Sequence, residues 1–162
     1  MSASVGEFGM MRKEVGSGLA PDVVAALFAA GVAAVDVAGA GGTSWSEVER
    51  HRLTGTHKRI ALAFRSWGIP TTQAVIAARA VAADRLVFAS GGVRTGMDVA
   101  IALGLGADVV GLAGPFLRAA AAGPEAAADL AVELAGVLRV VMFCVGAGDL
   151  ASSRAVPRLV NV

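Results

Sequence analysis

The sequence has little cysteine and almost no net charge. Its 162 residues include one cysteine, Cys144, so the chain cannot form a disulfide within itself. Fourteen basic residues against thirteen acidic residues give a formal charge of +1. This balance excludes the strong basic surplus that is typical of proteins that bind nucleic acids or membrane surfaces. We therefore expect neither kind of partner, and a cytoplasmic location.

Uninterrupted apolar stretches of membrane-spanning length are also missing. The composition is 56% hydrophobic and the mean hydropathy is +0.67, values that by themselves suggest a membrane protein. A transmembrane helix needs about 20 consecutive, mainly apolar residues. Charged residues interrupt the most apolar regions here, namely Arg118, Asp129, Glu133 and Arg139. The abundance of Ala, Gly and Val instead suits closely packed helices and parallel strands covered on both faces.

Strand-like and helix-like segments alternate along the chain. Such alternation predicts parallel strands joined by right-handed crossovers. We count about four strand–helix units, half of the number in a (β/α)₈ barrel, which typically has about 250 residues. The expected strands are residues 10–14, 32–38, 85–89 and 108–112, and the expected helices are 21–30, 71–82, 96–105, 115–120 and 124–145.

Other segments have weaker patterns. Residues 1–9 have no clear period and are expected to be an irregular start, whereas residues 149–162 form a loosely patterned tail. One domain is therefore expected over residues 10–148. Between the second and third expected strands, a short helix begins at Trp45, and residues 53–66 are expected to form a long loop that covers a site.

Two of the expected strands end in glycines. The strand at 85–89 stops at Ser90-Gly91-Gly92, and the strand at 108–112 stops at Ala113-Gly114 before Pro115 opens a short helix. Glycines let backbone N–H groups close around an anion, and proline at the first helical position leaves the next N–H groups free. Many (β/α)₈ barrels hold a phosphate with the loops after strands 7 and 8 and a short extra helix. These segments therefore predict a phosphate site.

Two charged residues fall on the first two expected strands. Lys13, followed by a glycine-rich loop, is placed to reach a ligand at the top of a barrel, or else it is a solvated edge charge. Asp36 lies inside its strand, and we favour a buried aspartate bonded to neighbouring backbone over a catalytic one. The histidines at 51 and 57 have no companions at ligand spacing, so no metal site is predicted.

Four segments together resemble a known family. They are KEVGSG at 13–18, VDVAGAGGTSWSEVERHR at 35–52, WGIPT at 67–71 and the run ASGGVRTGMDVAIALGLGADVVGLAGPFLRAA at 89–120. This combination resembles the C-terminal half of type 2 isopentenyl-diphosphate delta-isomerase, a flavoenzyme. The resemblance implies an α/β fold, the C-terminal half of a (β/α)₈ TIM barrel. GGTSW and WGIPT separate this family from other FMN barrels, which share the glycine loop after strand 7.

The resemblance also implies a reaction and a cofactor site. In this family reduced FMN, with NADPH as reductant, serves as the acid and base that convert isopentenyl diphosphate to dimethylallyl diphosphate in isoprenoid biosynthesis. Mg²⁺ bridges the substrate diphosphate, and its ligand is expected in the N-terminal half, so no catalytic side chain and no metal ligand is expected here. The implied flavin contacts are Lys13 and Thr43, and the implied phosphate contacts are Gly91, Gly92, Val93, Arg94, Ala113 and Gly114.

Two other functions stay open at this level. The chain is alternatively another FMN-dependent dehydrogenase or oxidase barrel, or a half-barrel that binds FMN or phosphate without catalysis. An oxidase predicts a histidine–arginine pair at strand ends, which the sequence does not offer. Four parallel strands also leave two unpaired edges and an apolar inner face. We therefore expect a homo-oligomer, or association with a complementing N-terminal half.

Overall fold

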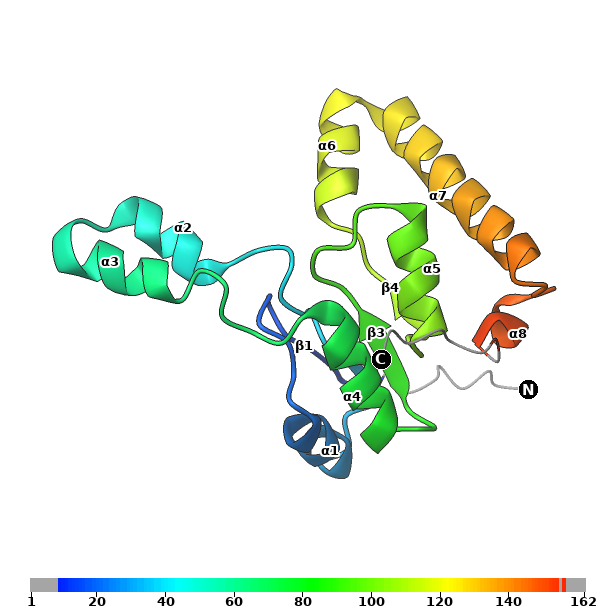
Figure 1. The fold of residues 1–162 in the computed structure, drawn as a ribbon, viewed down its shortest axis with the longest axis horizontal. Coiled ribbons are helices and arrows are strands. Elements are labelled where there is room, and N and C mark those ends of the chain that lie inside the picture. Colours follow the sequence, from blue (N-terminus) through cyan, green and yellow to red (C-terminus); the bar gives the residue numbers. More distant parts are fainter. Residues whose placement is uncertain (1–8, 155, 157–162) are drawn as a thin grey trace, which may run out of the picture.

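The computed structural model describes residues 9–154 and 156 and contains a four-stranded sheet. The strands follow one another in chain order, and every neighbouring pair is parallel (Figure 1). This arrangement confirms the predicted α/β fold with parallel strands. The strands are β1 (Met11–Lys13), β2 (Ala34–Asp36), β3 (Leu86–Ala89) and β4 (Val109–Val110).

The strands are shorter than the apolar segments that predict them. β2 has three residues and β4 has two, although residues 32–38 and 108–112 were both expected to be extended. The backbone pairing nevertheless continues beyond the strand ends, since Gly39 N donates to Ser90 O at 2.9 Å and Gly111 N donates to Ala89 O at 2.8 Å. The glycine loops therefore start in register with one another.

Helices cover one face of the sheet. Val35 and Val87 lie side by side in the register of β2 and β3, and both are fully buried. They pack in one hydrophobic core with residues of the three covering helices. These helices are α1 (Pro21–Ala29), α4 (Thr71–Val81) and α5 (Gly96–Gly104). The alternation of side chains along a strand places the neighbouring residues on the opposite face.

That opposite face carries large exposed apolar side chains. Met11, Leu86 and Val109 are exposed by 46%, 52% and 43% respectively. Met11 and Leu86 both face Ala34 in the strand register, and Val109 pairs with Phe88, two residues along from Leu86. All three side chains therefore lie on the side of the sheet that the helices do not cover.

The expected loop over residues 53–66 is wrong, because most of it is helical. Helix α3 (Gly55–Ala63) packs beside α2 (Trp45–Arg52), and the pair projects away from the sheet (Figure 1). No residue of either helix is buried. Since α3 contacts one other helix rather than a core, its sequence needs no clear apolar stripe, and the helical period is correspondingly weak.

The C-terminal part contains three helices in the described residues. The expected short and long helices are present as α6 (Gly114–Ala122) and α7 (Pro124–Cys144). A further short helix, α8 (Leu150–Arg154), lies within the expected tail. Residues 1–8, 155 and 157–162, which make up most of the expected irregular start and tail, lie outside the described residues, so the domain limits stay a prediction. Across the described ranges, no helix combines the length and the apolar character needed to cross a bilayer.

An arginine–aspartate pair fastens the end of the sheet at which β3 and β4 begin. Arg79 of α4 donates through Nη2 to Asp108 Oδ2 at 2.6 Å, and Val87 N donates to the same oxygen at 2.8 Å. Arg154 of α8 pairs with Asp108 Oδ1 at 3.0 Å. The Arg79 guanidinium also donates to four backbone carbonyls, those of Ala82, Ala83, Arg85 and Gly106.

This pair predicts a loss of stability in acid. Partial burial opposes ionisation of Asp108, but the Val87 N–H and the Arg79 guanidinium outweigh it and hold the pKa of Asp108 below its usual value. A carboxyl group whose pKa is lower in the folded state stabilises the fold at any pH above its pKa in the unfolded state, which is about 3.9. This stabilisation is lost as the pH falls through the pKa of the folded state. Urea unfolding followed by circular dichroism at several acidic pH values gives the free energy of unfolding. We expect this free energy to fall less steeply with decreasing pH in Asp108→Asn than in wild type. The exposed Asp129→Asn serves as control, and equal slopes for wild type and Asp108→Asn would contradict the prediction.

Candidate functional site

A pocket of about 620 Å³ lies where the four strands end. This volume is within the range of roughly 300–1,000 Å³ that is usual for small-molecule sites. Residues from the ends of β1 and β2 and from the loops after β3 and β4 line it. All eight residues predicted from the sequence are among the lining residues, namely Lys13, Thr43, Gly91, Gly92, Val93, Arg94, Ala113 and Gly114.

Two glycine loops touch backbone to backbone beside the pocket. Gly91 and Gly92 both have positive φ values, of 95° and 77°, which other residues rarely adopt. A Cβ atom on Gly91 would lie 2.1 Å from Gly39 O, and one on Gly92 would lie 2.6 Å from Gly41 O. Glycine is therefore required at both positions, by conformation and by space.

The loop after β3 presents free donors to the pocket. Within the described residues, the N–H groups of Gly91, Gly92 and Val93 donate to no protein acceptor. The next two N–H groups differ, because those of Arg94 and Thr95 both donate to Asp98 Oδ2 at 3.0 Å. The three free N–H groups and the first turn of α6 provide the unpaired donors that anion sites use.

The same hydrogen bonds cap helix α5 and lower the pKa of Asp98. Thr95 Oγ1 accepts from Asp98 N at 3.1 Å, which completes a capping box at the start of the helix. The Arg94 N–H is the main cause that lowers the pKa of Asp98, and burial opposes it. The loop after β3 and helix α5, which follows it, are thus held in one geometry.

Two arginines lie near these donors, and only one of them was predicted. Arg94 donates to Gly92 O at 3.2 Å and to Gly41 O at 2.9 Å, so its guanidinium ties the two glycine loops together. Arg118 lines the pocket from the first half of α6. Its Nη1 lies 3.6 Å from the position of a Cβ on Gly114. Side chains of a helix lean toward its N-terminus. An arginine four residues after Gly114 was therefore the one sign in the sequence that Arg118 reaches the pocket.

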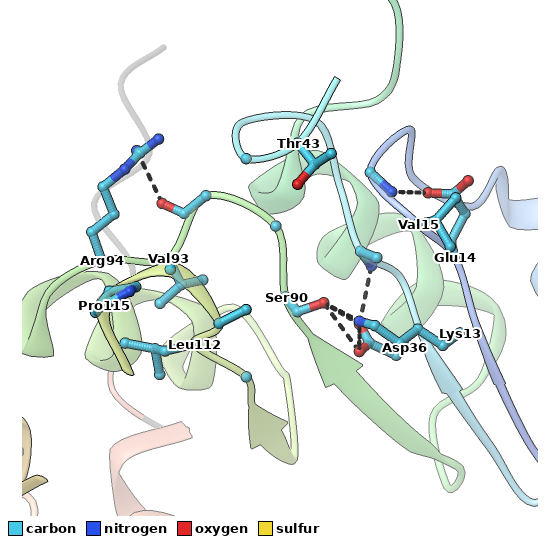
Figure 2. Close-up of a pocket in the computed structure, with 18 of the residues that line it drawn as sticks. Lys13, Glu14, Val15, Asp36, Thr43, Ser90, Val93, Arg94, Leu112 and Pro115 are labelled. Atoms are coloured by element: carbon cyan, nitrogen blue, oxygen red, sulfur yellow. Dashed lines mark hydrogen bonds and ion pairs between the residues drawn. The ribbon is translucent and has the colours of Figure 1, made fainter. Parts of the chain in front are cut away.

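A cluster of polar side chains, Lys13, Asp36 and Ser90, lies apart from Arg94 in Figure 2. Lys13 Nζ lies 2.5 Å from Asp36 Oδ2 and 2.7 Å from Ser90 Oγ. Ser90 Oγ in turn lies 2.8 Å from Asp36 Oδ1, which also accepts from Ala38 N at 3.0 Å. Asp36 is 6% exposed. The prediction of a buried aspartate bonded to neighbouring backbone is confirmed, and the aspartate also pairs with Lys13, which is therefore more than a solvated edge charge.

Loops and apolar side chains complete the pocket. Thr43 lies in the loop after β2, with Val15 across from it in Figure 2. The loop that carries Val15 is shaped by Glu14, whose Oε2 accepts the N–H groups of residues 16, 17 and 18. Val93 and Leu112 add apolar surface. Sequence reasoning missed Glu14, because one acid at a strand end gives no sign that it folds the following turn.

The arrangement suits an elongated ligand with an anionic end. Free backbone donors and the start of α6 gather around the two glycine loops, while a lysine ammonium and hydroxyl groups line the rest of the pocket. The first group of donors fits the phosphate of FMN, and the ammonium fits the electron-rich edge of its ring. No three His, Cys, Asp or Glu side chains in residues 9–154 and 156 gather closely enough to bind a metal ion together.

A parallel sheet alternating with helices, with a glycine-lined pocket at the strand ends, defines part of a (β/α)₈ barrel of the kind that often holds a phosphate at this edge. The model of the FMN-dependent dehydrogenase family matches residues 13–157. The chain therefore belongs to the FMN-dependent dehydrogenase family.

Proteins similar to this chain include isomerases and an oxidase. An isopentenyl-diphosphate delta-isomerase of Xanthobacter autotrophicus is 50% identical over 145 residues, which cover 90% of this chain and 42% of the relative. One from Synechococcus sp. is 50% identical over 88% of this chain and 41% of its own length. A mandelate oxidase structure with an FMN adduct is matched over 92% of this chain and 41% of the oxidase chain, with a TM-score of 0.68 and 22% identity. The chain thus spans about two fifths of the length of the curated relatives.

Proposed function

We propose that this chain supplies the FMN-binding half of a type 2 isopentenyl-diphosphate delta-isomerase, which converts isopentenyl diphosphate to dimethylallyl diphosphate. The observation that carries the proposal is the single pocket that gathers all eight predicted residues. The 50% identity with proteins that bear this name supports the choice of reaction. A cytoplasmic location stays a prediction.

Each group of residues has a separate part in this proposal. The free N–H groups of the loop at 91–93 and the start of α6 bind the FMN phosphate. Lys13 and Thr43 contact the ring, where a fixed cation stabilises negative charge that develops in a water-poor site. When bound and reduced, FMN supplies the acid and base of the isomerisation. NADPH is proposed as the reductant, and Mg²⁺ as the partner of the substrate diphosphate, with ligands from the part of the relatives that this chain does not span.

An oxidase is the less favoured alternative. The likeness to mandelate oxidase, at 22% identity, shows the fold alone. An oxidase of this family requires a histidine–arginine pair at the strand ends. The described residues that line the pocket include Arg94 and Arg118 but no histidine.

The proposal is tested by complementation. We expect the chain alone to bind FMN weakly, because a half-open pocket buries less than the 70–90% or so of ligand surface that is usual. Adding the part of the Xanthobacter isomerase that this chain does not match should raise both FMN affinity and turnover, assayed with Mg²⁺ and NADPH. Lys13→Ala in this assembly should lower turnover more than FMN retention. Flavin fluorescence that never changes on titration with the chain, alone or complemented, would contradict the proposal.

We also propose that the chain associates through its open sheet face. The exposed Met11, Leu86 and Val109 side chains form an apolar surface on that face, and surfaces of this kind mark interaction sites. Light scattering at micromolar concentration should therefore give a mass above the 16.1 kDa of one chain. Lysine in place of Leu86 should lower that mass. A uniform monomer for the wild-type chain would contradict association.

A further inference from the structure

Three side chains at the edge of the pocket form a closed ring of hydrogen bonds (Figure 2). Lys13 lies at the end of β1, Asp36 at the end of β2, and Ser90 directly after β3. The strand register pairs Lys13 with Asp36, and Asp36 with the residue two positions before Ser90. Three neighbouring strands thus fix the positions of the three side chains.

The donors and acceptors of the ring can be assigned one by one. An ammonium has three N–H donors, and Lys13 directs two of them to Asp36 Oδ2 and Ser90 Oγ. Because Ser90 Oγ accepts from Lys13, its single proton is directed to Asp36. Among the described residues, the third N–H of Lys13 has no protein acceptor. That donor is available to a ligand, since Lys13 lines the pocket.

We propose that Asp36 is a positioning residue that, together with Ser90, holds the Lys13 ammonium at one point, with its third N–H toward the ring of FMN. This inference rests on the proposed function. A lysine side chain is flexible, and that of Lys13 is 49% exposed. Without its two partners the Lys13 side chain would lose conformational freedom when the ligand binds. The hydrogen bonds to Asp36 and Ser90 fix the side chain before the ligand binds. Burial makes the pairing mutual, because a buried carboxylate without a cation is costly.

A purely structural role for Asp36 is the competing explanation. Asp36 Oδ1 accepts from Ala38 N at 3.0 Å, and Ala38 has a φ of +36°. A positive φ is uncommon for a residue other than glycine, and an aspartate that bonds to the backbone two residues onward supports such a turn. The two explanations separate by substitution. Asp36→Asn keeps the oxygen that accepts from Ala38 and removes the charge, whereas Asp36→Ala removes both.

The first measurement uses the chain without flavin. A lysine ammonium held by hydrogen bonds gives an observable ¹⁵N–¹H signal, which we assign to Lys13 by its absence in Lys13→Met. We expect this signal in wild type and its loss in both Asp36→Asn and Ser90→Ala. A signal that persists in Asp36→Asn would overturn the inference whether or not FMN binds.

The second measurement is the midpoint potential of FMN bound at saturation. We expect Asp36→Asn, Ser90→Ala and Lys13→Met each to make the potential more negative, because a displaced cation stabilises the reduced ring less. The Asp36→Asn and Ser90→Ala proteins should bind FMN within about threefold of wild type, and Lys13→Met combined with Asp36→Asn should match Lys13→Met alone, since coupled residues are not additive. Asp108→Asn is the matched control at the other end of the sheet and should leave the potential unchanged.

The outcomes distinguish the two proposals. A potential that moves in Asp36→Ala but not in Asp36→Asn shows that Asp36 acts only through the turn at Ala38, and this result overturns the inference. Additive shifts in the double variant overturn it as well. A wild-type chain that binds no FMN contradicts the proposed function, while the ammonium signal separately decides whether Asp36 holds Lys13.

Discussion

Replacement of Gly92 by aspartate is expected to lower the affinity for FMN by about 100-fold or more. A Cβ at this position would lie 2.6 Å from Gly41 O, and φ is +77°. The substitution therefore pushes the two glycine loops apart and places a carboxylate among donors that would serve a phosphate. Loss of two hydrogen bonds to a charged group, at about 1.5–3 kcal/mol each, corresponds to at least this factor. Quenching of flavin fluorescence measures the dissociation constant.

Gly104→Asp is the matched control for this experiment. A Cβ on Gly104, at the end of α5, meets nothing within 4 Å. The same carboxylate is thereby added away from the pocket, and we expect FMN affinity to stay within about twofold of wild type. Circular dichroism checks that both variants keep their helices. Unchanged affinity in folded Gly92→Asp would show that the phosphate does not bind at this loop.

Replacement of Arg79 by methionine is expected to cost about 3 kcal/mol of unfolding free energy. The Arg79 and Asp108 side chains are 23% and 17% exposed, so methionine leaves a half-buried carboxylate without its main partner. Four backbone carbonyls lose a donor as well. Urea unfolding followed by circular dichroism gives the free energy. Combining Arg79→Met with Asp108→Asn should recover part of the loss, because the stranded charge is removed.

Arg59→Met provides the comparison. Arg59 is exposed on α3, and its guanidinium bonds to Thr56 in the same helix. Its removal should change the unfolding free energy by no more than about 0.5 kcal/mol. Losses of similar size at Arg79 and Arg59 would mean that the bonds between α4 and the starts of β3 and β4 contribute nothing beyond an ordinary surface arginine.

The pocket residues were predictable to different degrees. The glycines at 91 and 92 were found because such residues directly after an apolar strand have few explanations other than a turn that approaches a ligand. Arg118 was missed because an arginine in an alanine-rich helix has the same pattern whether it faces solvent or a pocket. Arg94 was predicted at the phosphate loop, and the structure additionally shows that it binds Gly41 O, 53 residues away. Sequence spacing carries no information on such a distant partner.

The secondary structure was also predictable where its signals are local and not where it depends on other segments of the chain. Helix α7 was predicted over its full length, because proline at its start and a sustained 3.6-residue period are local signals. Helix α3 was predicted as a loop, because it packs on one other helix and needs little apolar surface. The strands were predicted too long, because the residues that keep regular strand geometry depend on the register with a neighbouring segment of the chain, which the sequence does not show.

By itself the sequence determined the order of the strands and of most of the helices, the glycines that line the pocket, and the resemblance to FMN-dependent isomerases. These features are local, or are preserved as motifs, so they can be read along the chain. Only the tertiary structure decided that Lys13, Asp36 and Ser90 meet. Their hydrogen bonds join residues up to 77 positions apart, and parallel strand pairing, which brings distant strand ends to one edge of the sheet, is the physical reason that they form one ring.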